Sequence, residues 1–378
     1  MYQSPFKSLA IIAGVVVPCT ILLIGCSDAA TSPGPPKPPR PGIIATLILD
    51  TFEGSGQSVH PDPVVVPAGW GTSQSYLVAT PYPNGNQTYE NPSFYEETSS
   101  LTWRAPGGAV NPVIRPDAGY LSDPDQLYNP VTHEIWMYYR QVTTTNQILL
   151  LRTADGVHWS APQLLVTVPN HLAISPTVVR KSATDWWMWT VNGGTKGCSG
   201  ASTTVEARRS VDGVTWSDPT TVTMQDGSKF PWHLDVTWVP QRNEYWALYN
   251  AKDAGSCTTT ELRFATSTDG IQWTVLPTPL LARGAIPEFA DVVYRSSLSY
   301  DAASDQVTIW YSGARVAAGK YIWGLATQSM ARATMFAIAS GTEDGTAPTT
   351  VQMNRQTPAG QGPPTAPATP PLTNETAP

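Results

Sequence analysis

The chain of 378 residues has few charged residues, and these are more often acidic than basic. Asp, Glu, Lys and Arg make up 13% of the sequence, with 29 acidic and 22 basic residues and a formal net charge of -7. Binding to a nucleic-acid backbone requires a cluster or stripe of Lys and Arg side chains. The sequence contains no such stripe, which argues against a nucleic-acid partner.

Several familiar catalytic signatures are also missing. The sequence has no Walker-type phosphate loop, no Cys/His cluster at zinc-ligand spacing and no Ser-His-Asp signature. It has no helical periodicity of useful length, which excludes a mainly helical fold. The His-Pro and His-Leu pairs are not spaced like metal ligands on one element, so we expect no cofactor and assign no metal ligands.

The one long apolar run lies at the N-terminus. It follows Lys7 and reaches Ile24, a pattern typical of a secretory signal. Residues 23–26, Leu-Ile-Gly-Cys, resemble a bacterial lipoprotein box, which implies cleavage before Cys26 and a lipid on its sulfur. A plain signal peptide and an uncleaved membrane anchor remain as alternatives. We expect a signal peptide over 1–25, a proline-rich tether over 26–42 and a location in the cell envelope with the lipid as sole membrane contact.

Cysteine is scarce, with four residues in all. Cys19 lies in the expected signal and Cys26 is the expected lipidation site, which leaves Cys198 and Cys257. These two occupy the same position in successive repeats, in the segments NGGTKGCSG and NAKDAGSCT. In an exported protein we expect them to form a disulfide bond.

A motif of the form Ser/Thr-x-Asp-Gly-x-x-Trp occurs three times, with Asp155, Asp212 and Asp269 each 57 residues apart. An Asp-Gly pair at a strand end makes a tight turn, so these residues are expected to be structural. A degraded copy, TSSLTW, carries Ser99 and Ser100 in place of Asp-Gly.

Between these turns lie short runs rich in Val, Ile, Tyr, Trp and Thr, about four to a repeat. A period of 50 to 60 residues built from such strands indicates propeller blades. We predict an all-β, five-bladed β-propeller over 43–340, a disordered tail rich in Pro and Thr over 341–378, and a monomer.

The strands that open the five repeats carry polar residues at matching places. The segments are SVHPDPVVV, YLSDPDQLY, LAISPTVVR, PWHLDVTWV and PEFADVVYR, aligned on Pro61, Pro124, Pro176, Leu234 and Ala290. The residues before this column are His60, Asp123, Ser175, His233 and Phe289, and those after it are Asp62, Asp125, Thr177, Asp235 and Asp291. Because the first strand of each blade lines the channel and residues two apart face the same way, these side chains should meet at the axis.

Carboxylates held together repel one another, and function or a cation would have to offset that repulsion. A calcium ion in the axial channel is one such cation. The alternative is that each side chain only accepts backbone hydrogen bonds at the start of its strand.

Several motifs resemble the five-bladed propeller glycoside hydrolases, most closely family 43 and more distantly families 32 and 117. The likeness covers about residues 55–335, in SDPDQLYNPVTHEIWMYYR, the Asp-Gly boxes, WHLDV, and YRSSLSYD with VTIWYSG. It implies hydrolysis of a glycosidic bond, which requires an ionised carboxylate and a protonated carboxylic acid. The implied roles are Asp123 as base, Glu288 as acid, Asp235 as modulator of the acid, and His233 as a rival for acid or modulator.

The remaining axial residues are expected to hold substrate hydroxyls; they are His60, Asp62, Asp125 and Asp291. Arg295 shares a strand face with Asp291, and we expect it either to pair with that carboxylate or to hold a carboxylate of the substrate. The polar, proline-rich insertion at 80–92 is either a rim that contacts ligand or a plain surface loop.

These features favour a lipid-anchored glycoside hydrolase that acts on a plant or algal oligosaccharide or polysaccharide. A non-catalytic carbohydrate-binding lipoprotein is the main alternative. A glycoside phosphorylase is the least favoured, because it needs a cationic phosphate site and the axial segments contain few Arg or Lys residues.

Overall fold

The structure is a computed structural model that describes residues 43–99, 102–224, 229–342 and 349–351. The chain divides into two units, Met1–Lys37 and Pro38–Pro378. The first unit lies wholly outside the described residues, as do the predicted signal peptide, Cys26, the tether and most of the predicted tail. The description that follows concerns the second unit.

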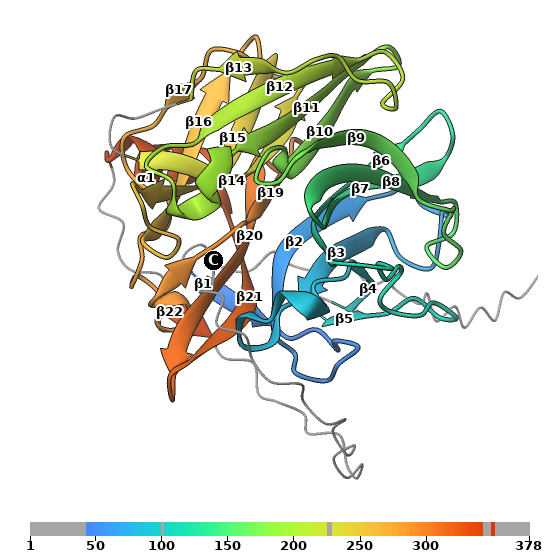
Figure 1. Cartoon of the computed structure of the whole chain (residues 1–378), viewed down its shortest axis with the longest axis horizontal. Helices are drawn as coiled ribbons and strands as arrows, with labels where there is room; N and C mark the ends of the chain where they lie inside the picture. Colours follow the sequence, from blue (N-terminus) through green and yellow to red (C-terminus); the bar gives the residue numbers. More distant parts are fainter. Residues whose placement is uncertain (1–42, 100–101, 225–228, 343–348, 352–378) are drawn as a thin grey trace, which may run out of the picture. The chain divides into compact units, whose positions relative to one another are not determined.

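Four antiparallel sheets of four strands follow one another along the chain (Figure 1). In chain order their strands are β2 (Ser58–Val65), β3 (Ser75–Pro81), β4 (Ser93–Ser99) and β5 (Thr102–Arg104); β6 (Tyr120–Asn129), β7 (Glu134–Val142), β8 (Thr145–Thr153) and β9 (Gln163–Pro169); β10 (Ile174–Ser182), β11 (Asp185–Asn192), β12 (Thr204–Ser210) and β13 (Thr220–Val222); and β14 (Lys229–Val239), β15 (Glu244–Asp253), β16 (Thr260–Ser267) and β17 (Thr274–Val275). Each is a blade whose strands are neighbours both in sequence and in space.

The fifth sheet joins the two ends of the propeller. It contains β18 (Val292–Val293), β19 (Ser297–Asp301), β20 (Gln306–Ala317), β21 (Lys320–Ala331), β1 (Ile43–Leu47) and β22 (Thr349–Val351). β1 pairs antiparallel with β21 and parallel with β22. The first strand of the described chain therefore completes the last blade. β22 lies inside the predicted disordered tail, where a strand was not expected.

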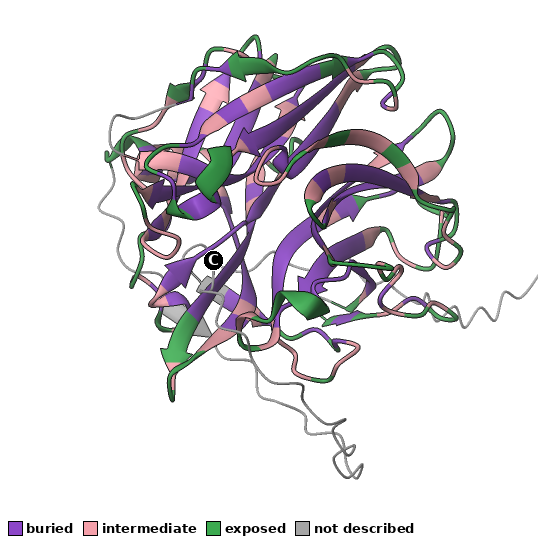
Figure 2. Cartoon of the chain, viewed as in Figure 1, coloured by how far each residue is buried: buried purple, intermediate pink, exposed green. Residues whose placement is uncertain are grey.

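The first strands of the five blades form a closed ring. β2 contacts β6, β6 contacts β10, β10 contacts β14, β14 contacts β19, and β19 contacts β2. Buried residues dominate the inner strands, and exposed residues lie mainly in turns and outer strands (Figure 2). The predicted five-bladed β-propeller is thus confirmed.

The repeated Asp-Gly motif is a turn, as predicted. The Oδ1 atom of Asp155 accepts hydrogen bonds from the backbone N–H groups of Val157 and His158, both at 2.8 Å, and Asp212 and Asp269 each accept the equivalent pair. The glycines that follow these aspartates all have φ of +75°, a conformation that favours glycine.

The blades are also linked at their rims and ends. Cys198 and Cys257 form the expected disulfide bond, with their Cα atoms 4.9 Å apart. The helix α1 (Arg332–Ser340) follows β21, and four 3-10 turns lie between strands: η1 (Pro83–Gly85), η2 (Gln87–Tyr89), η3 (Gly194–Ser199) and η4 (Pro287–Phe289). Within the described ranges, no helix has the length and apolar character needed to cross a membrane.

Candidate functional site

A bulge at the start of the inner strands turns polar side chains toward the axis. The pairing of β2 with β3, β6 with β7 and β10 with β11 shifts register after Val59, Ser122 and Ile174. Residues within these bulges have positive φ: 55° for His60 and 52° for Asp123. Bulges commonly re-aim side chains beside functional sites, and here they bring residues from separate blades together.

Asp123 is the centre of the upper axial cluster, which we define as His60, Asp123 and His233. One carboxylate oxygen, Oδ1, lies 3.3 Å from Nε2 of His60 and 3.3 Å from Nδ1 of His233. The other oxygen, Oδ2, lies 2.8 Å from Nε of Arg140, which comes from β7. All four side chains are buried.

Burial and charge set the protonation states of this cluster. Burial alone would raise the pKa of Asp123, but the Arg140 guanidinium and the two imidazoles hold that pKa well below its usual range. Burial lowers the pKa of both His60 and His233, against the opposing effect of the Asp123 carboxylate. At neutral pH the cluster therefore contains one carboxylate and two neutral imidazoles.

These three side chains form a ligand set suited to a divalent transition metal. Nε2 of His60, Oδ1 of Asp123 and Nδ1 of His233 make no hydrogen bond within the described chain, although all three are buried. They offer ligand atoms that lie within 4.8 Å of one another. Two neutral imidazoles and a carboxylate are typical ligands of zinc, manganese or iron. The three residues thus fit a metal ion. The sequence did not predict this site, because their spacing along the chain matches no metal-binding motif.

Thr80 orients one of the imidazoles. Its hydroxyl oxygen lies 3.0 Å from Nδ1 of His60, on the side of the ring away from the Asp123 carboxylate. The same Nδ1 accepts the backbone N–H of Asp123 at 3.4 Å, so the neutral ring carries its proton on Nε2, which lies 3.3 Å from Oδ1 of Asp123. A metal held by Nε2 would require the other tautomer, in which Nδ1–H donates to the Thr80 oxygen.

Glu90, in the polar insertion, is a second carboxyl group near the cluster. Burial, with a further contribution from Asp123, raises its pKa to about 8, while Arg140 and a hydrogen bond with Ser122 act in the opposite direction. Glu90 therefore holds a proton at neutral pH while Asp123 is ionised. Environments that push two carboxyl pKa values apart are typical of acid and base pairs.

Aromatic side chains cover this cluster and line a cavity of about 40 Å³. The ring of Tyr294 stacks on His60 with centroids 5.2 Å apart and meets His233 edge-on at 4.5 Å. Tyr82, Tyr321 and Trp323 line the same cavity. The tyrosine is thus both a wall of the cavity and a neighbour of the potential metal ligands.

A second axial cluster lies beside the first and consists of Asp62, Asp125, Asp235 and Arg295. Oδ1 of Asp125 lies 3.4 Å from the Arg295 guanidinium, and all four side chains are buried. Burial raises the pKa of Asp62 and Asp235, and that of Asp125 to about 7, while Arg295 opposes each shift. The Arg295 guanidinium supplies positive charge among these carboxylates. The sequence had allowed for a calcium ion in the axial channel to do so.

The same carboxylates join neighbouring blades. Oδ2 of Asp62 accepts the backbone N–H of Gln126, at 2.6 Å. The equivalent bonds run from Val178 to Asp125 at 2.9 Å, from Val236 to the hydroxyl of Thr177 at 3.0 Å, and from Leu298 to Asp235 at 3.0 Å. This series identifies Ser297 as the matching residue of the fifth blade, and therefore Arg295 as the counterpart of His60, Asp123 and His233.

The predicted alignment of the fifth blade is therefore wrong by six residues. Glu288 lies on η4, which packs against β20 and β21, and its neighbour Phe289 belongs to an outer apolar cluster. Asp291 accepts the backbone N–H of Val316 at 2.6 Å, instead of facing the axis. Arg295 pairs with Asp125 and not with Asp291. Within the described residues no ion pair joins Glu288 to Asp123, and Glu288 lies on an irregular turn that precedes the real inner strand.

The other predicted site residues do meet at the axis, in two clusters: His60, Asp123 and His233 in one, and Asp62, Asp125, Asp235 and Arg295 in the other. Sequence reasoning missed Arg140, Glu90 and Tyr294. The polar insertion at 80–92 was the one available signal for Glu90, whereas Arg140 lies on a second strand with no distinguishing motif.

No protein-family model matches the sequence. A curated relative, the A type blood N-acetyl-alpha-D-galactosamine deacetylase of Flavonifractor plautii, is 26% identical over 362 aligned positions that cover 81% of this chain. The match covers 46% of the relative, so this chain spans about half the length of that protein.

Solved structures show the same fold. An N-acetylgalactosamine deacetylase from F. plautii, in complex with blood group B trisaccharide, superposes with a TM-score of 0.69 at 23% identity, covering 78% of this chain and 95% of that one. An alpha-L-arabinofuranosidase from Podospora anserina, in complex with cellotriose, gives 0.52 at 12% identity, covering 76% and 95%. A family 43 enzyme from a capybara gut metagenome gives 0.52 at 12%, covering 77% and 54%. The neighbours are thus carbohydrate-active enzymes, among them family 43 glycoside hydrolases and a deacetylase.

Proposed function

We propose that this protein is a metal-dependent hydrolase that removes the acetyl group from an N-acetylated sugar of a glycan. The observation that carries the proposal is the convergence of three buried ligand atoms, one from each of three blades, within 4.8 Å of one another in the upper axial cluster. The deacetylase relative supports the choice of an acetamido group, because its similarity extends over 81% of this chain.

The chain's own residues would share the work as follows. His60, Asp123 and His233 would hold a divalent cation, which acts as a Lewis acid toward a carbonyl oxygen when bound. Arg140 keeps the Asp123 carboxylate ionised and fixed at 2.8 Å, as a ligand must be. Glu90 retains a proton near neutral pH and can give it to the departing nitrogen. In the net reaction, water adds to the acetyl carbon, the C–N bond breaks, and acetate and an amine are released.

The aromatic side chains beside the cluster suit a sugar as the substrate, whereas the cavity between them, about 40 Å³, has room for water only. Tyr82, Tyr294, Tyr321 and Trp323 present apolar ring surface beside the polar cluster. Sugar rings have apolar faces that stack on aromatic side chains, while their hydroxyl groups need polar partners. An aromatic wall next to a charged cluster offers both.

A glycosidase is the second candidate, and the opposite pKa shifts of Asp123 and Glu90 favour it. In this version Asp123 would be the base and Glu90 the acid for cleavage of a glycosidic bond in a plant or algal oligosaccharide. Glu90 would then take the role that the sequence had suggested for Glu288.

Acetate release separates the two candidates. Protein lacking residues 1–42 would be incubated with the blood group A trisaccharide and with aryl furanosides, and both acetate and new reducing ends would be quantified. The deacetylase proposal requires acetate without new reducing ends, and loss of activity on dialysis against a chelator with recovery on adding Zn²⁺ or Mn²⁺. Release of reducing ends that resists chelation would favour the glycosidase, and silence on all substrates would favour a binding protein.

We also propose that Cys26 carries a lipid that holds the enzyme at the cell envelope. The support is the lipoprotein-like box at residues 23–26 and the proline-rich segment that separates it from β1. Labelling with a fatty-acid probe, compared between the wild-type precursor and Cys26→Ser, tests this location.

A further inference from the structure

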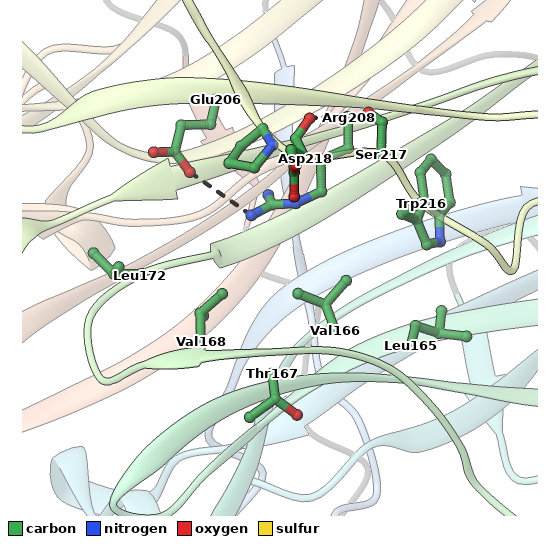
Figure 3. A pocket seen from close by; sticks show the side chains of 11 residues that line it. Leu165, Val166, Thr167, Val168, Leu172, Glu206, Arg208, Trp216, Ser217 and Asp218 are labelled. Atoms are coloured by element: carbon green, nitrogen blue, oxygen red, sulfur yellow. Dashed lines mark hydrogen bonds and ion pairs between the residues drawn. The ribbon is translucent and has the colours of Figure 1, made fainter.

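A second pocket lies away from the axis, between the second and third blades. It has a volume of about 300 Å³ and is lined by β9 on one side and by β12 with the loop that follows it on the other. Figure 3 shows Leu165, Val166 and Val168 of β9 directed toward Arg208, whereas Thr167 points the other way. A register shift between β8 and β9 explains why Leu165 and Val166, though adjacent, lie on the same side.

The pocket has a buried polar floor. Arg208 is only 4% exposed; its guanidinium donates a hydrogen bond to Thr190 at 3.1 Å and lies 3.9 Å from a carboxylate oxygen of Glu206. Asp218 also lines the pocket, so two carboxylates accompany one guanidinium, and this charge balance disfavours an anionic ligand. The pocket presents N–H donors and carboxylate acceptors side by side, as a ligand with several hydroxyl groups requires.

The rest of the lining combines apolar and aromatic side chains with Thr167, Ser217 and Asp218. Trp216 closes one end, and its indole Nε1 has no hydrogen-bond partner in the described chain although that atom is buried. An unpaired donor of this kind costs free energy unless a ligand or water accepts from it. Opposite it lie the apolar side chains of β9.

We propose that this pocket is a second carbohydrate-binding site that takes one neutral pyranose ring of a glycan. The polar pair would bind hydroxyl groups, Trp216 and β9 would contact the apolar face of the ring, and the volume is at the small end of the range for ligand sites. In its choice of a sugar as ligand, this inference rests on the proposed function. The site would hold a glycan to the enzyme at a place separate from the axis.

Two variants on the same strand form a matched test. Val168→Trp fills the pocket, whereas Leu164→Trp adds the same side chain at an exposed position of β9 that does not line the pocket. The probe is N-acetyl-D-galactosamine, and the readout is the NMR signal of the Trp216 indole N–H, assigned with Trp216→Phe. Leu172→Trp narrows the pocket from another segment and serves if Val168→Trp does not fold.

The expected result is a saturable shift of the Trp216 signal in wild type and in Leu164→Trp, with affinity at least tenfold weaker in Val168→Trp or Leu172→Trp. No shift in wild type, or an equal shift in the filled variants, would overturn the second site. Acetate release by wild type, measured in parallel, reports on the axis alone. Acetate release without a shift of the Trp216 signal would contradict only the second site. A shift of the Trp216 signal without acetate release would contradict only the proposed function.

Discussion

At the scale of single residues, His233 gives a direct test of the metal ligand set. Neither of its ring nitrogens has a hydrogen-bond partner in the described chain, and Nδ1 faces Asp123. Loss of an outer-shell partner alone typically costs about 10- to 100-fold in metal affinity or activity, so His233→Asn, which removes a ligand, should cost more than about 100-fold. Metal content by mass spectrometry of the purified protein and acetate release measure the two effects.

The control for this variant is His158→Asn, which changes an exposed histidine in a turn. It should keep both the metal and the activity. Full metal content in His233→Asn would show that the cluster is a buried polar network and not a ligand set.

The raised pKa of Glu90 predicts that the free energy of unfolding depends on pH. Its pKa rises from 4.5 to about 8 on folding, so the stability contributed by its protonated form is complete below pH 4.5 and is lost as pH rises through 8. Glu90→Gln mimics the protonated form and should remove this loss. The free energy of unfolding by urea should therefore fall less between pH 6 and pH 9 in the variant, by an amount on the order of 3 kcal/mol at most.

Asp117→Asn is the matched control, because it removes an exposed carboxylate. It should leave the wild-type slope against pH unchanged. Parallel pH profiles for wild type and Glu90→Gln would mean that Glu90 is ionised in the folded protein, and the proposed proton donor would then be lost.

At the scale of elements, the bonds between neighbouring inner strands distinguish two hydroxyl residues. The Thr177 hydroxyl accepts the backbone N–H of Val236 at 3.0 Å, whereas the equivalent position across from Ser297 is Pro63, which has no N–H. The Ser297 hydroxyl accordingly has no partner in the described chain. Thr177→Val should cost about 1–3 kcal/mol by leaving a buried donor unpaired, and Ser297→Ala should be nearly neutral.

Urea unfolding of both variants at one pH measures this difference. Equal losses of stability would contradict the idea that the hydroxyl and carboxylate bonds to the next strand hold the blades together.

The same elements explain what the sequence could and could not predict. Repeated Asp-Gly turns fixed the period, and the His-Pro and Asp-Pro pairs marked the inner strands of the first two blades. The fifth inner strand carries Ser296 and Ser297 where the first two blades carry Pro and Asp, so the nearby segment PEFADVVYR matched better. Proximity across blades, such as that of Arg140 to Asp123, depends on ring closure and leaves no local pattern.

At the scale of the whole propeller, β1 closes the ring. It pairs with β21, and Leu47 and the following Leu49 are 3% and 1% exposed within an apolar cluster that includes Trp103 and Trp310. Losing a buried Leu typically costs about 2–5 kcal/mol, and a domain has only about 5–15 kcal/mol of stability in total. A chain that begins at residue 50 should therefore lose most of its stability, whereas one that begins at residue 42 should not.

Closure of the propeller by β1 should also determine whether the candidate site forms. Its three residues, His60, Asp123 and His233, come from the first, second and fourth blades. A ring opened at the fifth blade cannot hold three ligands at fixed separation. The chain beginning at residue 50 should thus bind metal poorly even where circular dichroism still reports β-structure. Thermal unfolding with and without Zn²⁺ measures this: the metal should raise the midpoint in the longer chain only, and an equal rise in both would mean that the axial cluster forms without the closing strand.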